Sequence, residues 1–202
     1  PNQLEKDYMI GITRQSGDAY RYDGSHMMGA FPFYFKKIGN KIQLIEKNTK
    51  FRADHRTPSD RSISNHISNS IWASANIEAI NEDSLGGQLL IDLDKLLVND
   101  INSTSHNNKK LTFDKSNSYL SSIQSFPNNS EIEFVLHFKS KNPNFIYTLP
   151  DSRSMLHRYH ISIFSIISSN DYSPRLADDR VGHFMTMYQD YTNVRKESAY
   201  TR

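Results

Sequence analysis

Four charged side chains close to the end of the chain form its densest group able to make charge-assisted hydrogen bonds: Arg175, Asp178, Asp179 and Arg180. Two arginines and two carboxylates at this spacing could bind a substrate or a partner, or pair with one another and lock the loop. Gly182 follows, where the backbone can take an unusual angle or pack closely. Compact networks of paired ions are commoner in scaffolds than in chemistry, so we predict that these groups bridge one another or the preceding strands.

Two histidines three residues apart, His157 and His160, are the strongest candidates for a metal pair. Their neighbours alternate as in a strand, where residues three apart point to opposite faces, so we interpret them as unrelated histidines. An enzyme site built from dispersed residues would require three of four histidines to share one cavity: His26, His55, His137 and His160.

The sequence lacks the short motifs of several enzyme classes. It contains no His-Glu-x-x-His, no Gly-x-Ser-x-Gly elbow and no phosphate-binding Gly-Lys-Ser/Thr loop. It also contains no cysteine, which excludes disulfides, thiolate zinc sites and cysteine nucleophiles. We therefore predict that this chain holds no catalytic residue, no metal ligand and no cofactor.

Two pairs of neighbouring polar residues have simpler interpretations than chemistry. Asp92 and Asp94 alternate at the end of an expected strand and could face one way as paired carboxylates, but we predict that Asp94 caps a short helix over residues 95–98. Asp54 and His55 are adjacent in an expected loop, where side chains point apart, and we interpret them as solvated.

Length and charge limit the classes of protein to consider. A chain of 202 residues favours one large domain, and we expect a single strand-rich domain over residues 1–202. Its 24 basic and 22 acidic side chains leave a formal charge of +2, so we expect no nucleic-acid partner. No apolar run approaches the ~20 residues needed to cross a bilayer, and we expect no membrane span.

Short alternating segments dominate the chain and predict the elements that must position these side chains. In residues 131–139, Ile132, Phe134, Leu136 and Phe138 fall on one face of a strand, and acidic residues and a histidine fall on the other. Strands are also expected over residues 7–13, 31–37, 41–46, 74–80, 88–93, 154–167 and 182–191. Local alternation with short turns favours antiparallel pairing.

Helical signals are fewer. Ser59 can cap a helix over residues 59–73, in which Ile63, Ile67 and Ile71 form one apolar stripe. Shorter helices are expected over residues 94–98 and 118–123. The fold class that follows is mainly β or α+β, with an antiparallel sheet or β-sandwich and one or two short helices.

The segment that contains the four charged residues also carries a sequence signature. The run Pro174-Arg175-Leu176-Ala177-Asp178-Asp179-Arg180-Val181-Gly182-His183-Phe184 resembles PR-x-x-D-x-RVG-[YH]-F. That pattern belongs to an uncharacterised domain that precedes the catalytic part in a family of large bacterial zinc-dependent metalloproteases. Four weaker segments fall in the same order as in that family: Phe51–Asp54, Ser70–Ser74, Ile91–Asp94 and Ser125–Glu133. The resemblance spans most of residues 7–202.

The resemblance implies that the chain is the non-catalytic N-terminal accessory domain of a zinc metallopeptidase. In that family the zinc ligands lie in a His-Glu-x-x-His segment C-terminal to this domain, so zinc and peptide hydrolysis are expected there. We expect the domain to pack on that catalytic domain of the same polypeptide and to shape access of a peptide substrate. Residues 192–202 would be a tail or linker towards it, and the charged residues of the signature would fix the exit path. The family also implies a bacterial cell-envelope or secreted location.

A second hypothesis belongs to a different class of protein. In it the chain is a free-standing β-sandwich that binds a glycan or a peptide through exposed aromatic residues, with four candidates: Tyr20, Tyr22, Phe31 and Tyr34. Aromatic residues in strands more often belong to the core and its rim, so burial of all four would remove this hypothesis.

Overall fold

The protein consists mainly of β-strands arranged in two compact units. In the computed structural model of the chain, the described residues are 3–17, 29–82, 87–100, 105, 110–140, 142, 149–166 and 188–192. Unit 1 comprises residues 1–47 and 71–166, and unit 2 comprises residues 48–70 and 167–202. The expectation of a single domain over residues 1–202 stays a prediction. Among the described residues, no helix is long and apolar enough to cross a membrane.

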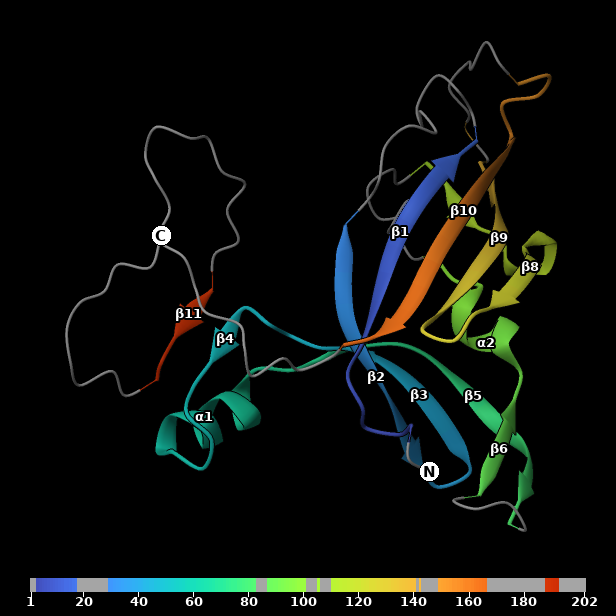
Figure 1. Cartoon of the computed structure of the whole chain (residues 1–202). Coiled ribbons are helices and arrows are strands. Elements are labelled where there is room, and N and C mark those ends of the chain that lie inside the picture. The colour runs from blue at the N-terminus through green and yellow to red at the C-terminus, as the bar shows by residue number, and fades with distance from the viewer. Residues whose placement is uncertain are drawn as a thin grey trace. The chain divides into compact units, whose positions relative to one another are not determined.

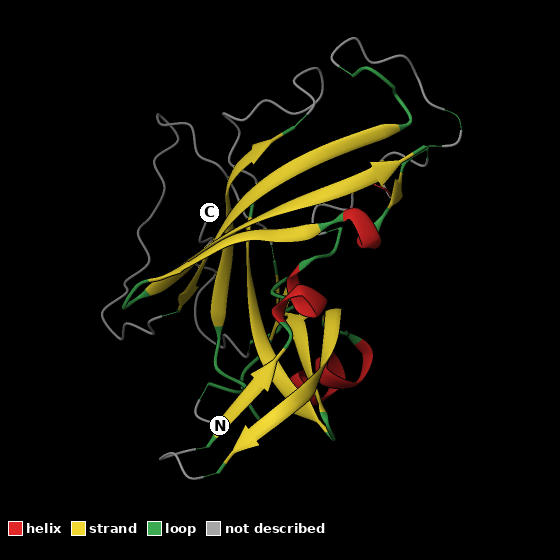
Figure 2. Cartoon of the chain, turned by 90° about the vertical axis from the view of Figure 1, so that its right-hand side faces the viewer, coloured by secondary structure: helices red, strands yellow, loops and turns green. Residues whose placement is uncertain are grey.

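Unit 1 is built on a nine-stranded sheet with the order β6-β5-β3-β2-β1-β10-β9-β7, and β8 also pairs with β9. The strands are β1 (Tyr8–Ser16), β2 (Ala30–Ile38), β3 (Lys41–Glu46), β5 (Ser70–Asn81), β6 (Gln88–Ile91), β7 (Thr112–Phe113), β8 (Tyr119–Ser125), β9 (Asn129–Lys139) and β10 (Ser154–Ser165). The longest ladder pairs β9 with β10 in antiparallel register over eleven residues of each strand. Figures 1 and 2 show the strands twisting and curling. The predicted mainly β class is confirmed, and the main sheet is antiparallel and curled.

Strands β2 and β3, which match the strands expected over residues 31–37 and 41–46, form a hairpin. Ile38 pairs with Lys41, so Gly39 and Asn40 form a two-residue turn. Gly39 has a φ of 57°, in the left-handed region that glycine enters at little cost.

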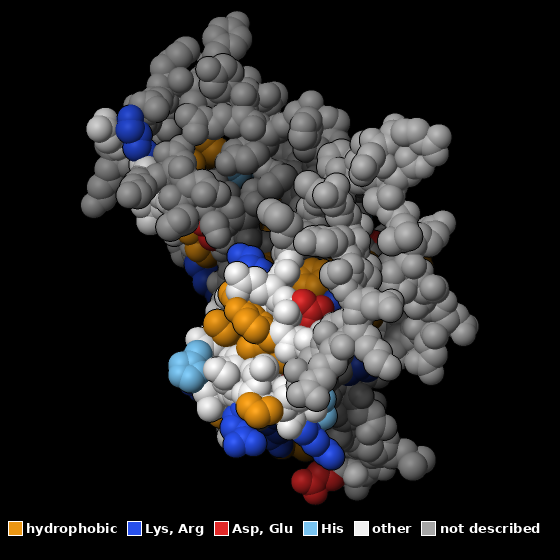
Figure 3. Space-filling model, turned by 90° about the vertical axis from the view of Figure 1, so that its left-hand side faces the viewer, with side chains coloured by type: hydrophobic (Ala, Val, Ile, Leu, Met, Phe, Trp, Pro, Cys, Tyr) orange, Lys and Arg blue, Asp and Glu red, His pale blue; other side chains and the backbone are white. Residues whose placement is uncertain are grey.

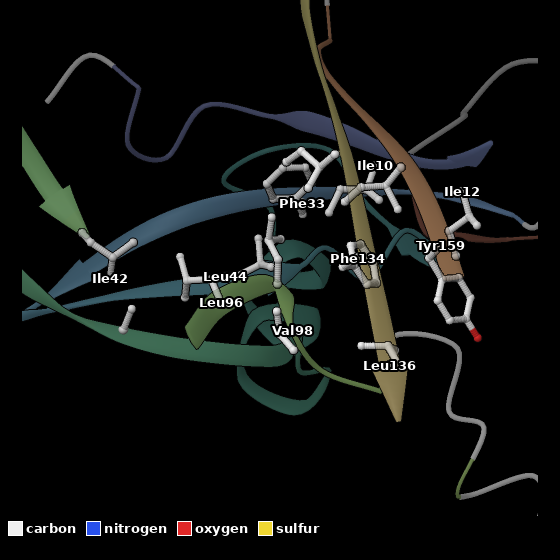
Figure 4. Packing of buried hydrophobic residues seen from close by; sticks show 14 of the residues in the cluster. Ile10, Ile12, Phe33, Ile42, Leu44, Leu96, Val98, Phe134, Leu136 and Tyr159 are labelled. Atoms are coloured by element: carbon white, nitrogen blue, oxygen red, sulfur yellow. The ribbon is translucent and has the colours of Figure 1, made fainter. Parts of the chain in front are cut away.

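The core lies on the face of β9 where the sequence places its apolar residues. Ile132, Phe134, Leu136 and Phe138 are all buried, as predicted. Phe134 stacks on Tyr159 of β10, with ring centroids 5.7 Å apart. Figure 4 shows Phe134, Leu136 and Tyr159 near core side chains of β1, β2 and β3 and near Leu96 and Val98. Full burial of each such side chain stabilises the fold by about 1.5–3 kcal/mol.

Helix α2 (Leu93–Leu97) begins one residue after its cap, which is Asp92. The Asp92 carboxylate accepts a hydrogen bond from the Asp94 backbone N–H at 3.1 Å. The prediction that Asp94 is the cap is therefore wrong, because Asp92 is still extended and its side chain already reaches the first free N–H. The helix buries Leu96 and Leu97 in the core of unit 1.

Helix α1 (Pro58–His66) belongs to unit 2 and is shorter than predicted. It begins at Pro58, after Thr57, whose hydroxyl accepts from the Asp60 N–H at 3.2 Å. The predicted continuation to residue 73 is wrong, because the chain turns extended at Ile67 and enters β5. The four-residue spacing of isoleucines crosses this boundary by coincidence, and the last of them is 60% exposed in the strand.

The helix predicted over residues 118–123 is also wrong. Only the short 3-10 helix η1 (Lys115–Asn117) precedes this segment, which is strand β8. The open edge of β9 explains the difference, because pairing along it gives the backbone of β8 hydrogen-bond partners on one side.

Unit 2 joins α1 to a pair of two-residue parallel strands, β4 (Phe51–Arg52) and β11 (Gln189–Asp190). The Arg52 guanidinium donates to the Asp190 carboxylate from Nε at 2.8 Å and lies over the ring of Tyr188 at 4.0 Å. This contact lowers the pKa of Asp190 to about 2. Of the strand predicted over residues 182–191, the structure describes residues 188–191, which contain β11.

Candidate functional site

The charged signature near the chain end lies outside the described residues. This holds for Arg175, Asp178, Asp179, Arg180 and Gly182, and also for Tyr20, Tyr22 and His26. The proposed bridges among the charged residues therefore stay a prediction.

The two remaining aromatic candidates, Phe31 and Tyr34, lie half-buried in β2. Phe31 packs against Trp72 of β5 with ring centroids 4.3 Å apart and borders the core. The indole N–H of Trp72 donates to Glu46 Oε2 at 2.8 Å, which holds this pair in place. Phe31 is thus a packing residue at the rim of the core.

The two histidines of β10 point to opposite faces, as predicted. His157 is buried on the core face, with its ring centroid 5.0 Å from that of Phe138. His160 lies on the other face, where its Nδ1 is 2.5 Å from Thr13 Oγ1 and its Nε2 is 3.5 Å from Glu131 Oε2. Within the described part of the chain, no group of three or more His, Asp or Glu side chains is placed to hold a metal ion.

His137 of β9 joins two residues from other elements in one hydrogen-bonded chain. Its Nδ1 lies 3.1 Å from Asp114 Oδ2, and its Nε2 lies 2.8 Å from Ser154 Oγ. Asp114 is 7% exposed, whereas Ser154 is exposed at the start of β10. We call Asp114, His137 and Ser154 the relay. A buried carboxylate, an imidazole and a surface hydroxyl in this order are the parts of a nucleophilic serine site.

A break in the edge of the sheet positions the carboxylate of the relay. Between β7 and β8 the chain leaves β9 for the turn of η1, opposite His137. The Asp114 N–H still donates to the His137 carbonyl at 2.9 Å. The His137 N–H in turn donates to the Ser118 hydroxyl, also at 2.9 Å. The backbone of His137 is therefore held from both sides of the turn, and Asp114 reaches its ring.

The Asp114 carboxylate is stabilised in its ionised form. It accepts hydrogen bonds from Ser116 Oγ at 2.7 Å and Asn117 Nδ2 at 2.8 Å, and lies 3.3 Å from the Lys139 ammonium. The hydrogen bonds from Ser116 and Asn117, with smaller ones from His137 and Lys139, hold the pKa of Asp114 well below its usual range.

The ionised carboxylate fixes the tautomer of His137. An ionised carboxylate only accepts hydrogen bonds, so the Nδ1 that faces Asp114 carries the proton. In the neutral ring, Nε2 is then the acceptor, and the Ser154 hydroxyl donates to it.

The only catalytic arrangement considered from the sequence was a cluster of histidines in one cavity, so the relay was missed. Asp114 and Ser154 lie 23 and 17 residues from His137, and strand pairing alone brings them together. His160 belongs to a different hydrogen-bonded group, and His55 belongs to unit 2. The sequence feature that pointed towards this site was His137, which lies on the polar face of the strand predicted over residues 131–139.

A second feature of unit 1 is an apolar groove beside the hairpin of β5 and β6. Its volume is about 620 Å³. The residues that line it are Gln3, Leu4, Phe35, Ile42, Ala79, Ile80, Asn81, Gly87, Gln88, Leu89, Leu90 and Ile91. Ile80 and Leu90 are 49% and 62% exposed, so the groove has apolar side chains at its open side.

Unit 2 has a smaller hollow of about 360 Å³ along α1. Ser59, Ser62, Ile63 and His66 line it at helical spacing. Figure 3 shows the side of the molecule that carries α1 in Figure 1, where hydrophobic side chains (orange) lie among polar and basic ones.

The depressed pKa of Asp114 makes the stability of unit 1 depend on pH. The unfolded state binds this proton with an ordinary pKa of about 3.9, so stability is complete above that pH and is lost as pH falls towards the folded pKa. We expect Asp114→Asn to lower the urea midpoint at pH 7 and to cost somewhat less at pH 3, where the unfolded state already binds most of the proton while the folded carboxylate is still ionised. Trp72 fluorescence across the two urea series checks this. A cost that is equal at both pH values would contradict the assigned role of the carboxylate.

The chain was compared with models of protein families. The model of a family described as a domain of unknown function, DUF5117, matches residues 25–202. No curated protein and no solved structure matches the chain.

Proposed function

We propose that this chain, which belongs to the DUF5117 family of domains of unknown function, is the accessory domain of a zinc metalloprotease. In this proposal it packs on the metalloprotease domain of the same polypeptide, shapes access of peptide substrates and takes no part in the zinc chemistry. The resemblance of the signature near the chain end and of four ordered segments supports the choice of partner. The observation that carries the docking role is the apolar groove of unit 1.

The groove offers a partner both apolar and backbone contacts. Leu89 and Ile91 pack against the core, whereas Leu90 on the same strand projects outward and is exposed. Strand β6 ends the strand order, so its outer edge has no strand partner among the described strands. An exposed edge with free N–H and C=O groups can pair with an extended segment of another domain.

Burial of apolar side chains in such docking would contribute measurably to the binding free energy. Burying an exposed leucine or isoleucine is worth about 1.5–3 kcal/mol, and ~1.4 kcal/mol is a factor of ten in affinity. Ile80 and Leu90 lie on opposite faces of the β5–β6 ladder, since Ile80 pairs with Leu89 and Leu90 with Ala79. Leu90 is 62% exposed, and its burial alone is therefore worth about tenfold or more in affinity. We place the contact of the metalloprotease domain on the edge of β6 around Leu90.

We expect Leu90→Asp to weaken binding to the separately produced metalloprotease domain by at least about tenfold, since a carboxylate cannot enter the apolar groove. The measurement is calorimetric titration of that domain with the 202-residue chain. Leu156→Asp is the matched control, because Leu156 is 47% exposed on β10, outside the groove. Equal affinities of the two variants, or no binding by the wild-type chain, would refute the docking role.

The same groove suits a second function, the binding of an extended peptide by a free-standing module. Its aliphatic lining favours an apolar peptide over a glycan, and Phe31 is engaged with Trp72. Binding of a short apolar peptide to the chain, with no affinity for the metalloprotease domain, would favour this alternative.

A further inference from the structure

We propose that the relay makes Ser154 a nucleophile that hydrolyses esters of apolar carboxylic acids. This activity goes beyond the docking role, because it uses the opposite end of the strand order from the groove. It also departs from the sequence prediction that the chain holds no catalytic residue. The argument rests on three properties of the relay: bonding order, access and surroundings.

The bonding order is that of an activated hydroxyl. Asp114 fixes the proton on Nδ1 of His137, which leaves the Nε2 lone pair 2.8 Å from Ser154 Oγ. The imidazole is thereby positioned as a general base, and the ionised carboxylate stabilises the imidazolium that forms when it takes the proton.

Solvent exposure increases along the relay from Asp114 to Ser154, as a nucleophilic serine site requires. The carboxylate is buried and the imidazole side chain is 15% exposed, while the serine is exposed at the surface. A carbonyl group in solution can therefore reach the hydroxyl, whereas water has little access to the bond between Asp114 and His137.

Two neighbours on the same face of the sheet suit an apolar ester. Lys139 is the direct cross-strand partner of Ser154, and such side chains start about 5 Å apart. Its ammonium can stabilise an oxyanion that forms beside Ser154. Leu156, two residues along β10 and opposite His137, gives an exposed apolar contact for the acyl chain.

The reaction needs no reagent besides the ester and water. Ser154 Oγ attacks the carbonyl carbon while its proton moves to His137 Nε2, and the carbonyl electron pair moves to oxygen. Collapse of this intermediate breaks the bond to the alcohol, which leaves with the proton from His137. Water, deprotonated by the same nitrogen, then attacks the acyl group on Ser154 and releases the carboxylic acid. Asp114 stays ionised throughout, and Ser154 is restored.

The test combines hydrolysis of p-nitrophenyl butyrate with fluorophosphonate labelling of the 202-residue chain. We expect the reagent to attach to Ser154, as identified by mass spectrometry of peptides, and Ser154→Ala to lower kcat/KM by at least a hundredfold. Ser122→Ala, the same change at an exposed position of β8, is the matched control and should keep both signals. His137→Gln should lose labelling as well, and Leu90→Asp should keep it.

Peptide mapping separates the relay from the weak ester hydrolysis of surface histidines. Labelling that persists in Ser154→Ala, or hydrolysis by this variant at the wild-type rate, would overturn the proposal. No adduct on a wild-type chain with a native circular dichroism spectrum would overturn it too. Ser154 is exposed, so its alanine variant is expected to fold even if the His137 variant does not.

Discussion

Replacing Phe134 by alanine should destabilise unit 1 by about 3–5 kcal/mol, the largest effect that we expect from one substitution. Phe134 is fully buried in β9 and lies directly opposite Tyr159 of β10, on which it stacks. Alanine would leave a cavity that two long paired strands cannot close. A domain of this size is stable by only about 5–15 kcal/mol, so the loss is a large share of the total.

Urea unfolding followed by tryptophan fluorescence measures this effect. Trp72 is the only tryptophan of the chain and lies in β5, so its signal reports on unit 1. Phe126→Ala is the matched control, because Phe126 is 51% exposed after β8 and should lose less than about 1 kcal/mol. Similar costs for the two variants would contradict the placement of Phe134 in the core.

The difference between these two phenylalanines could be predicted from the sequence. Residues 131–139 alternate except at Val135, and a one-residue change of register would expose the apolar face of β9 that carries Phe134. Burial of one face thus determines both the strand and its orientation. The same reasoning correctly separates His157 from His160 on β10.

The sequence prediction failed where structure depends on a distant neighbour. Residues 118–123 have no strong local preference, and the edge of β9 decides that they form a strand. Ile67 and Ile71 continue a helical spacing, yet the first ends α1 and the second lies in β5. The spacing of residues within a short segment carries no information about a partner strand that is distant in the sequence.

The relay was missed for the same reason. Its residues have no fixed spacing, since Asp114 follows β7, His137 lies in β9 and Ser154 begins β10. A motif search recognises nucleophiles on short turns, whereas this arrangement comes from pairing across three strands. The docking groove has a clearer origin, because Leu90 belongs to a run of three apolar residues whose burial alternates in β6, at the end of the strand order.

The second large effect is expected at Gly17, which follows β1 where this strand runs beside β10. A Cβ atom there would lie 2.8 Å from the Leu156 carbonyl oxygen and 3.2 Å from the His157 Cα. Both atoms belong to the backbone of β10, which would have to move away from β1. We therefore expect Gly17→Ala to destabilise unit 1 by about 1–3 kcal/mol.

Gly11, in the middle of β1, makes a matched comparison for Gly17. A Cβ atom at Gly11 has nothing within 4 Å, and alanine there reduces the freedom of the unfolded chain. Gly11→Ala should therefore leave stability unchanged or raise it by up to about 1 kcal/mol. The measurement is the urea midpoint followed by Trp72 fluorescence. If alanine lowers stability at Gly17 but not at Gly11, the close approach of β1 and β10 lies after Ser16. Equal effects at both glycines would show that β10 yields at this point, and the close contact would then carry no stability.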